Sequence, residues 1–342
     1  MYLKHQFISF LTWILLCASL SGKSQKPSFY TVTPFQDDDY FTKTVFPFNP
    51  AFIKEKRIKS ISFKYHAEKG VDYVYDFNSD GLVASMAATH YDKEKTDTVF
   101  YTRYDYNTKG QISKKARIDY RDGLVKMSRY RYDEKNRIDI ISIFSLNSQM
   151  PNRQQNSGWQ GEPAPGVDKI ILAGNFPDES LLDKMTLANE FSSWRYRYYT
   201  KDRFEAEERT EYYDFMKQHN NPDTCAQKET YYYLNGLPVV LFLHTGCAEK
   251  TLPSEMYQYK EGLLTEKKDS PTSLELKNEK YSYDKNNNLV LMENIWKGQK
   301  VSELIMTYDK KGFLVAIQRK SATAEASHYF QDRALKLTYT FY

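Results

Sequence analysis

Hydrophobic and polar positions alternate along most of this 342-residue chain, and short turn signals interrupt the alternation at a step of about 25 residues. Two aromatic residues separated by one position precede most of these turns. The pairs are Tyr104/Tyr106, Tyr130/Tyr132, Tyr231/Tyr233, Tyr257/Tyr259 and Tyr281/Tyr283, with Tyr75/Phe77 as a close variant. Because residues two apart share one face of a strand, the pattern predicts strands that carry an aromatic face.

The turns share one sequence pattern, which we call the turn grammar. An acidic or amide residue follows the second aromatic residue, and glycine or asparagine comes three positions later, where a tight turn requires a positive φ. The recurring position is occupied by Gly81, Gly110, Asn136, Asn287 and Gly312. A repeat of about 25 residues accommodates two strands and two turns. We therefore predict an all-β fold, an antiparallel β-meander of hairpin repeats that forms one large twisted sheet.

One segment interrupts the repeat. Residues 147–166 are polar and rich in Pro, Gly, Gln and Asn, which predicts a loop, and residues 177–191 carry Leu181, Leu182, Met185 and Ala188 at helical spacing. Strands are expected to resume at Trp194. We divide the chain into a repeat region at 25–146, a loop and short-helix insertion at 147–192, and a second repeat region at 193–342. A true two-domain split near the insertion is the alternative.

Residues 1–24 have the parts of a secretory signal peptide. A polar start with Lys4 is followed by an apolar run from Phe7 to Leu20 and by small residues that suit cleavage after Ser24. The run is shorter than the roughly 20 residues of a membrane span. A retained anchor and a lipoprotein at Cys17 are the alternatives. We expect an exported protein, in the periplasm or at the cell surface, without a transmembrane segment once the signal is removed.

Signal removal leaves Cys225 and Cys247. They flank a hairpin signal, Asn235-Gly236, and their numbers place them nearly opposite each other at its open end. In an exported protein this arrangement predicts a disulfide. A redox or metal pair is the alternative.

The motif Tyr-Asp-x-x-Gly-x-Leu at Tyr308–Leu314 resembles the YD repeat of Rhs and teneurin-type proteins. Tyr132–Ile138 and Tyr283–Leu289 match it with asparagine in place of glycine. The resemblance covers about residues 60 to 140 and 228 to 320. It implies long antiparallel sheets that either spiral into shells or serve as extracellular binding scaffolds. A short, exported envelope member of this kind is the expectation.

Motifs for catalysis, metals and cofactors are incomplete. Asp76–Gly81 matches the opening of a calcium loop, but the position of its bidentate acid falls on Ala87, and a hairpin turn explains the same residues. The histidines lack metal-ligand spacing. We expect no catalytic residues, metal or cofactor, and classify the protein as non-enzymatic.

The tyrosine ladder is the candidate binding surface, comprising Tyr104, Tyr106, Tyr130, Tyr132, Tyr257, Tyr259, Tyr281 and Tyr283. The alternative is that these rings have only a structural role and cover a partly solvated sheet, with the apolar ring inward and the hydroxyl toward water. A net charge of +4 and export argue against nucleic acid. The expected function is a structural or binding scaffold in the cell envelope, with an envelope protein, a glycan or an apolar ligand as partner.

Three other functions remain open. One is a periplasmic carrier of lipid or another apolar ligand, and another is a hydrolase with its site in the 147–192 insertion. The third is an outer-membrane β-barrel, suggested by the alternating residues from Leu335 to Phe341 and the terminal Tyr342. Charges on both faces of strands such as Leu124–Tyr132 oppose the third.

Overall fold

The computed structural model describes residue 29 and residues 48–65, 70–92, 95–120, 124–147, 166–177, 190–201, 203–212, 225–245, 253–270, 277–322 and 333–342. They form one 18-stranded antiparallel sheet and two short helices. The helices are α2 (Pro50–Glu55) and α3 (Val167–Leu172). The strands are β1 (Ile58–Tyr65), β2 (Gly70–Phe77), β3 (Val83–Asp92), β4 (Lys95–Tyr106), β5 (Ile112–Asp119), β6 (Leu124–Tyr132), β7 (Ile138–Asn147), β8 (Glu190–Lys201), β9 (Phe204–Tyr212), β10 (Cys225–Leu234), β11 (Leu237–Thr245), β12 (Glu255–Lys260), β13 (Leu263–Asp269), β14 (Lys277–Tyr283), β15 (Leu289–Trp296), β16 (Gln299–Tyr308), β17 (Leu314–Ser321) and β18 (Arg333–Phe341).

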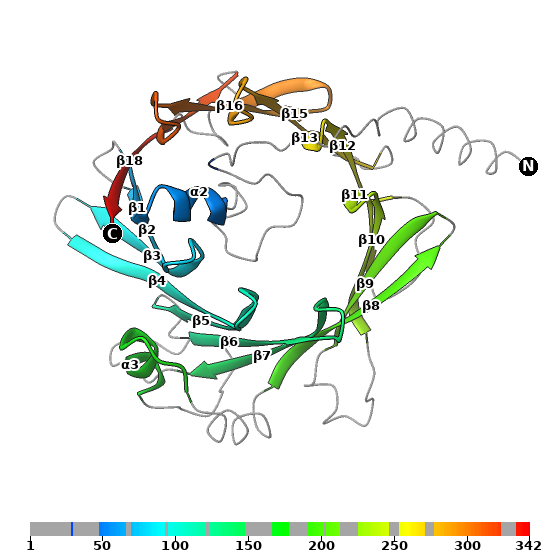
Figure 1. Ribbon diagram of the computed structural model, residues 1–342, viewed down its shortest axis with the longest axis horizontal. Helices are drawn as coiled ribbons and strands as arrows, with labels where there is room; N and C mark the ends of the chain where they lie inside the picture. Colours follow the sequence, from blue (N-terminus) through cyan, green and yellow to red (C-terminus); the bar gives the residue numbers. More distant parts are fainter. Residues whose placement is uncertain are drawn as a thin grey trace, which may run out of the picture.

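The sheet closes on itself. Each strand pairs with its neighbours in sequence, and β1 pairs with both β2 and β18, so the strands form a ring (Figure 1). The all-β antiparallel prediction is confirmed, but the single twisted sheet is a closed barrel. Closure has a physical reason, because the first and last strands would otherwise expose unpaired backbone groups along two long edges.

The insertion does not divide the sheet. β7 and β8 flank it and pair directly, with Ile141 opposite Trp194. Strands resume at Glu190, earlier than expected. The helix of this region is α3, while residues 178–189, which include most of the predicted helix, lie outside the described residues.

The two helices distinguish the two faces of the sheet. α2 lies inside the ring and α3 lies outside it (Figure 1). We call the face toward α2 the inner wall and the opposite face the outer wall. Because side chains alternate along a strand and pair across strands, these contacts assign each paired residue to one wall.

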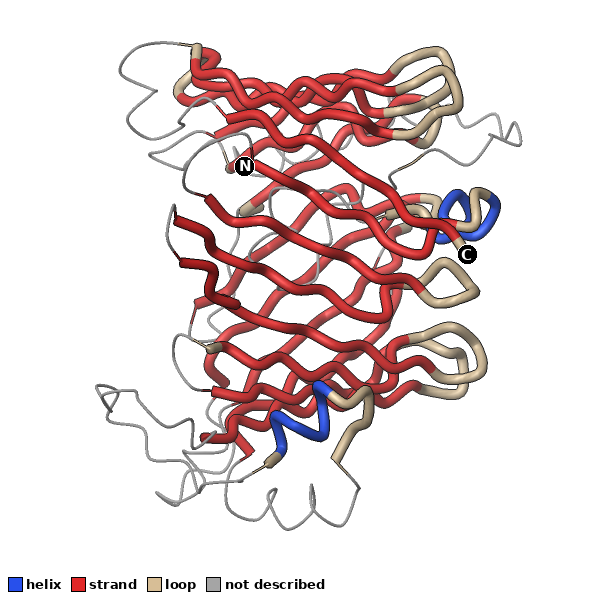
Figure 2. The backbone as a smooth tube through the Cα atoms, turned by 90° about the vertical axis from the view of Figure 1, so that its left-hand side faces the viewer, coloured by secondary structure: helices blue, strands red, loops and turns tan. Residues whose placement is uncertain are grey.

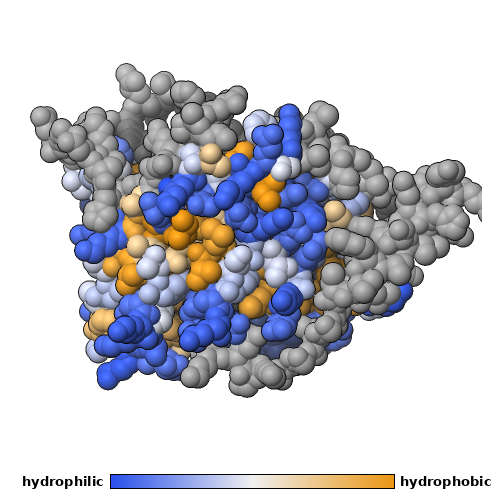
Figure 3. All heavy atoms as spheres, turned by 90° about the horizontal axis from the view of Figure 1, so that it is seen from above, coloured by the Kyte–Doolittle hydropathy of each residue, from blue (hydrophilic) through white to orange (hydrophobic). Residues whose placement is uncertain are grey.

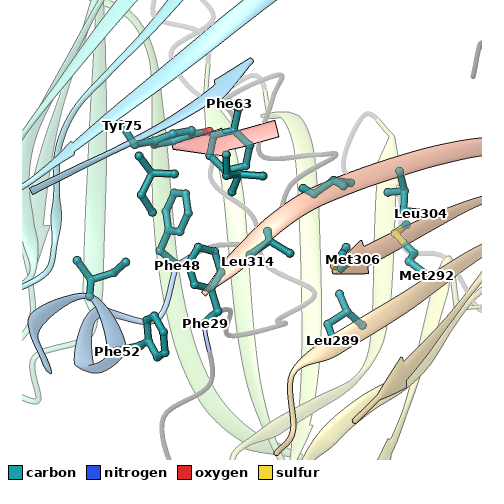
Figure 4. Close-up of a cluster of buried hydrophobic side chains, with 14 of the residues drawn as sticks. Phe29, Phe48, Phe52, Phe63, Tyr75, Leu289, Met292, Leu304, Met306 and Leu314 are labelled. Atoms are coloured by element: carbon teal, nitrogen blue, oxygen red, sulfur yellow. The ribbon is translucent and has the colours of Figure 1, made fainter. Parts of the chain in front are cut away.

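Aromatic and aliphatic side chains from the inner wall surround α2. Phe29, Phe48, Phe52 and Ile53 are buried there, and Phe48 packs edge-on against Tyr75 and Phe77 at centroid distances of 4.9 and 5.1 Å (Figure 4). The same buried cluster continues along β14–β17 through Leu289, Met292, Leu304, Met306 and Leu314. The inner wall therefore carries the main hydrophobic core.

α2 begins where the sequence provides a cap. The Asn49 side chain accepts a hydrogen bond from the amide of Ala51 at 3.1 Å, and Pro50 occupies the first turn. The helix sits directly on the turn after β2, where Gly81 approaches Pro50 so closely that an added Cβ would lie 2.2 Å from the Pro50 carbonyl oxygen. This contact fixes the helix at one end of the barrel.

Five turns at this end have the same construction. The side-chain oxygen of the first residue accepts hydrogen bonds from backbone amides two or four residues later, or both, and the fourth residue has a positive φ. The five begin at Asn78, Asn107, Asp133, Asp284 and Asp309. They form the row of short tan loops at the right-hand end of the barrel in Figure 2. The predicted turn grammar is confirmed at all five.

The outer wall is predominantly polar. Charged side chains from many strands lie on it, including Lys280, Glu293, Glu303, Lys320 and Lys336. Figure 3 shows this wall over the strands at the top of Figure 1, where hydrophilic side chains surround a smaller apolar patch. α3 covers a second apolar patch formed by Ala116, Ile118, Val125, Met127 and Phe144. Most of the outer wall therefore suits contact with water.

Candidate functional site: the tyrosine-lined inner wall

All eight tyrosines of the predicted binding surface lie on the inner wall. Each aromatic pair occupies the end of an even-numbered strand, and its two rings share one face. Tyr257 and Tyr281 are buried in the main cluster, and Tyr259 and Tyr283 pack against it. The rings therefore line the interior of the barrel and do not form an exposed strip. Whether they bind a partner stays a prediction.

A tyrosine near the end of a strand has a recurrent structural role. On β4, β6, β8, β14, β16 and β18 its hydroxyl donates to a backbone carbonyl in the preceding strand, in most cases that of the strand's first residue. Two tyrosines differ, because Tyr233 donates to the Glu207 carboxylate and the Tyr259 hydroxyl has no hydrogen-bond partner within the described residues. Distances are 2.7 Å from Tyr106 to Val83, 2.8 Å from Tyr132 to Ile112, 2.9 Å from Tyr198 to Ile138, 2.8 Å from Tyr283 to Leu264 and 2.9 Å from Tyr308 to Leu289. Tyr339 bonds to Leu314 in the same way. These bonds, which we call tyrosine latches, tie successive hairpins together around the ring.

The latches explain the spacing within the motif. The strand after each of Tyr106, Tyr132, Tyr283 and Tyr308 carries one extra residue opposite the tyrosine, so the ladder of that hairpin is bulged there, while the latch joins the tyrosine to the strand on its other side. The tyrosine hydroxyl supplies a donor to the neighbouring strand, and the next residue caps the turn. Tyrosine and the acidic or amide residue are therefore adjacent because each satisfies a different backbone group.

Removing one latch should measurably weaken the fold. We expect Tyr308→Phe to cost about 1–2 kcal/mol of unfolding free energy, because the carbonyl of the buried Leu289 loses its donor. Tyr259→Phe is the matched control, since the Tyr259 hydroxyl is buried without a hydrogen-bond partner within the described residues. Urea unfolding of both variants checks this. An equal loss in both would show that the hydroxyl bond contributes nothing specific.

A carboxylate precedes the tyrosine pair on three strands of the inner wall. Glu229, Glu255 and Glu279 each stand two residues before the first tyrosine and accept a hydrogen bond from its hydroxyl. This repeat was not among the predicted features. Its signal was the recurrence Glu-x-Tyr-x-Tyr, whose period of two places all three side chains on one face.

Two cations complete this part of the wall. The guanidinium of Arg209 lies over the rings of Tyr231 and Tyr196, at 4.4 and 5.4 Å, and its Nε contacts Glu207 at 2.5 Å. Lys267 contacts Glu255 at 3.1 Å. Strands β8–β10 and β12–β14 thus present phenol rings, carboxylates and paired cations, which suit polar recognition, whereas β11 contributes Leu241 and Leu243 and the wall near α2 is apolar.

Burial raises the pKa of these inner-wall tyrosines. For Tyr231, Tyr257 and Tyr281 the largest cause is loss of water around the hydroxyl, and the neighbouring carboxylates Glu229, Glu255 and Glu279 raise the pKa further. On the outer wall, burial and Tyr232 raise the pKa of Tyr199 to about 12. The folded protein therefore keeps these phenols neutral.

Alkaline pH should unfold the barrel. A pKa raised above its ordinary value of 10.0 means that the folded state holds protons that the unfolded chain releases, so stability is full below pH 10 and falls above it. We expect melting temperatures to drop above pH 10, and tyrosinate absorbance to appear together with the loss of the sheet signal in circular dichroism. Ionisation of most tyrosines while the sheet signal persists would contradict this.

Other predicted sites have different outcomes. In the calcium-like loop, the side-chain oxygen of Asn78 accepts hydrogen bonds from two backbone amides of the turn. This supports the hairpin interpretation. Within the described residues, no group of three or more His, Cys, Asp or Glu side chains could hold a metal ion. Cys225 begins β10, whereas Cys247 lies outside the described residues. The pairing of these two cysteines stays a prediction, and the proposed signal peptide also lies outside the described residues.

Helices in the described part of the chain are too short or too polar to cross a bilayer.

The amino-acid sequence matches no family model and no curated protein. Among solved structures it is similar to a porin-like protein from Bacteroides uniformis, with 11% identity, 92% of this chain and 100% of that one covered, and a TM-score of 0.31. It is also similar to the Photorhabdus luminescens Tc holotoxin pore, with 11% identity, 77% and 19% covered, and a TM-score of 0.15. With TM-scores this low, function is argued from the chain's own geometry.

Proposed function

We propose that this protein is an exported, non-enzymatic binding scaffold of the cell envelope that holds its ligand or partner segment against the inner wall. The observation that carries the proposal is the division of side chains between the two walls. Closure gathers the aromatic pairs of successive hairpins on the inside, together with the charged residues paired to them, while the outer wall is predominantly polar. An enclosed aromatic surface is concave, as binding sites for small ligands are.

The charges on the outer wall support the proposal of a barrel whose exterior faces water. Strands of an outer-membrane barrel carry an apolar band toward lipid, and each charge within that band costs roughly 2–4 kcal/mol at the midplane. Here Arg195 and Arg197 on β8, Glu293 on β15 and Lys336 on β18 point outward from the strands. The proposal is therefore an envelope protein in the periplasm or at the cell surface, not a membrane-embedded channel.

The repeat motif supports a scaffold role. The five turns and the latches show what the Tyr, Asp and Gly positions of the Tyr-Asp-x-x-Gly-x-Leu motif do physically, and the same positions carry the resemblance to YD-repeat proteins. We include kinship with that class in the proposal. A sheet built from copies of one local unit provides a rigid surface on which a ligand site can be placed.

Carriage of an apolar ligand is a second candidate, favoured by one observation. The apolar part of the inner wall extends from α2 along β14–β17, and Leu289, Met292, Leu304 and Met306 are buried there. A lipid chain would be compatible with this surface. The polar surface on β8–β10 and β12–β14 favours a glycan or a peptide instead.

Native mass spectrometry of the mature protein from envelope extracts tests the proposal. Ile141 faces inward between Tyr130 and Trp194, and Ile140 faces outward between Arg131 and Arg195. We expect bound mass on the wild type and on Ile140→Arg, and its loss from Ile141→Arg. The identity of the released molecule distinguishes lipid from glycan or peptide.

Circular dichroism confirms that both variants are folded before they are compared. An apo mass for the wild type, or equal retention by the two variants, would overturn the inner wall as the binding surface.

A further inference from the structure

Arginine and lysine concentrate on one sector of the outer wall. On strands β4–β8 the outward-facing cations outnumber the acids. This comparison covers the residues whose side chains the structure describes and their ion-pair partners. The cations are Arg103, Lys114, Arg129, Arg131, Arg195, Arg197 and Lys201, and the acids are Asp105 and Asp139. We call these seven cations the basic sector. Elsewhere on the outer wall cations and acids are intermixed, as in Lys268 with Glu266 and Lys300 with Glu303, both at 2.8 Å, and like charges are opposite each other at Lys64/Lys336 and Glu293/Glu303.

Aromatic rings hold two exposed arginines of the sector in place. The guanidinium of Arg195 lies 4.7 Å from the ring of Tyr212, and that of Arg197 lies 5.6 Å from Tyr199. Arg129 lies 5.9 Å from Phe144, but its Nε and Nη2 are buried, so it adds positive charge and not exposed donors. Stacking restricts a long side chain without using its N–H groups. An arginine held this way offers a planar set of donors that matches the oxygens of a phosphate.

The sector places like charges next to each other. Lys114 and Arg129 are direct partners across β5 and β6. Arg131 and Arg195 flank Ile140 on the two neighbouring strands. Like charges directly opposite in a sheet are destabilising. Arg131 is paired with Asp139 at 2.6 Å, and Glu208 of β9 lies opposite Arg197 but also contacts Lys228 at 2.8 Å, so the sector keeps an excess of positive charge. An external anion would relieve the repulsion.

The shape of the sector favours an extended anionic surface over a small anion. Five neighbouring strands at their usual spacing span about 20 Å, and they lie on the convex side of a closed sheet. α3 lies on the same side of the barrel, and its Leu172 is 48% exposed. Arg103 joins the two elements, because its guanidinium lies 5.9 Å from the ring of Phe176, just after α3.

We propose that the basic sector docks the protein on an anionic lipid surface, with the arginines on lipid phosphates and Leu172 entering the interface. Basic residues next to an anionic leaflet and an apolar side chain at the boundary are the two contributions that hold peripheral proteins on membranes. This inference goes beyond the proposed function, and its failure would leave binding at the inner wall intact.

Vesicle co-sedimentation tests the proposal. We expect the mature protein to bind phosphatidylglycerol-containing vesicles at low salt, to bind pure phosphatidylcholine vesicles far less, and to dissociate as salt rises. Arg195→Gln/Arg197→Gln should lower the partition coefficient about 30-fold. Leu172→Ser should weaken binding without changing the dependence on salt.

The control is Lys280→Gln/Lys336→Gln, which removes two exposed charges from strands outside the sector. This control removes the same net charge as the first double variant but leaves the basic sector intact. It should therefore retain most of the binding. Three results would overturn the proposal: equal binding to both kinds of vesicle, equal losses in the two double variants, or binding to soluble dextran sulfate without binding to vesicles. The last result would assign the sector to an acidic glycan.

Discussion

Replacing Gly81 by asparagine is expected to destabilise the protein by about 3 kcal/mol and to displace α2 from the end of the barrel. A Cβ at this position would lie 2.2 Å from the Pro50 carbonyl oxygen and 2.9 Å from the Lys54 amide nitrogen, and both are backbone atoms that cannot rotate away. Chemical denaturation measures the loss. Phe52 and Ile53 should then become accessible to protease cleavage in the native state.

Gly110→Asn is the matched control. Gly110 occupies the same position in the next turn, its φ is also positive, and an added Cβ would meet only the Leu82 Cδ1 at 3.6 Å. Asparagine occupies the equivalent position at Asn136 and Asn287 with positive φ, so the backbone conformation alone is tolerated. A similar loss in both variants would mean that the contact with α2 is unimportant.

Phe48→Ala is expected to have the second large effect, a loss of about 3–5 kcal/mol. The ring of Phe48 lies within 4.9 to 6.1 Å of those of Phe29, Phe63, Tyr75 and Phe77, so its removal leaves a cavity between the N-terminal segment and the inner wall. Thermal unfolding with far-ultraviolet circular dichroism measures the change.

Phe341→Ala provides the comparison for Phe48. Its side chain is 53% exposed and contacts Phe313 and Tyr339 at the edge of the same aromatic cluster. We expect it to cost well under half as much, because little surface is returned to water. If the two variants melted together, the N-terminal segment would not be part of the core.

The local structure could be predicted from the sequence because each signal acts over a few residues. The side chain of Asn107 or Asp309 caps its own turn, and the positive φ of Gly110 or Gly312 follows three residues later. These contacts do not depend on the rest of the chain. The predictions of strands and turns were therefore correct. The bulges in register occur at the motif itself.

Closure of the sheet could not be predicted this way. It depends on β1 meeting β18, whose paired residues Ser60 and Thr340 are separated by nearly the whole described chain. The aromatic repeat shows that two side chains share a face but not which face lies inside. That choice is settled by α2, whose residues Phe52 and Ile53 pack against only one wall.

Part of the candidate site was accessible to sequence reasoning and was overlooked. Glu229, Glu255 and Glu279 precede the aromatic pairs at constant spacing, so their common face with the tyrosines followed from the strand period. The basic sector is different. Arg131 and Arg195 lie in the same row only because β7 pairs with both β6 and β8 across the insertion.

The closed barrel can be tested directly by a cysteine cross-link between the first and last strands. The Ser60 and Thr340 side-chain oxygens lie 2.6 Å apart on paired residues, a geometry that suits a disulfide. We predict that Ser60→Cys/Thr340→Cys forms this bond under mild oxidation in the folded monomer, as shown by peptide mapping. Ser60→Cys/Thr307→Cys, which places the second cysteine on β16, should not. Free thiols at both positions of the first variant, in protein with an intact sheet signal, would contradict closure.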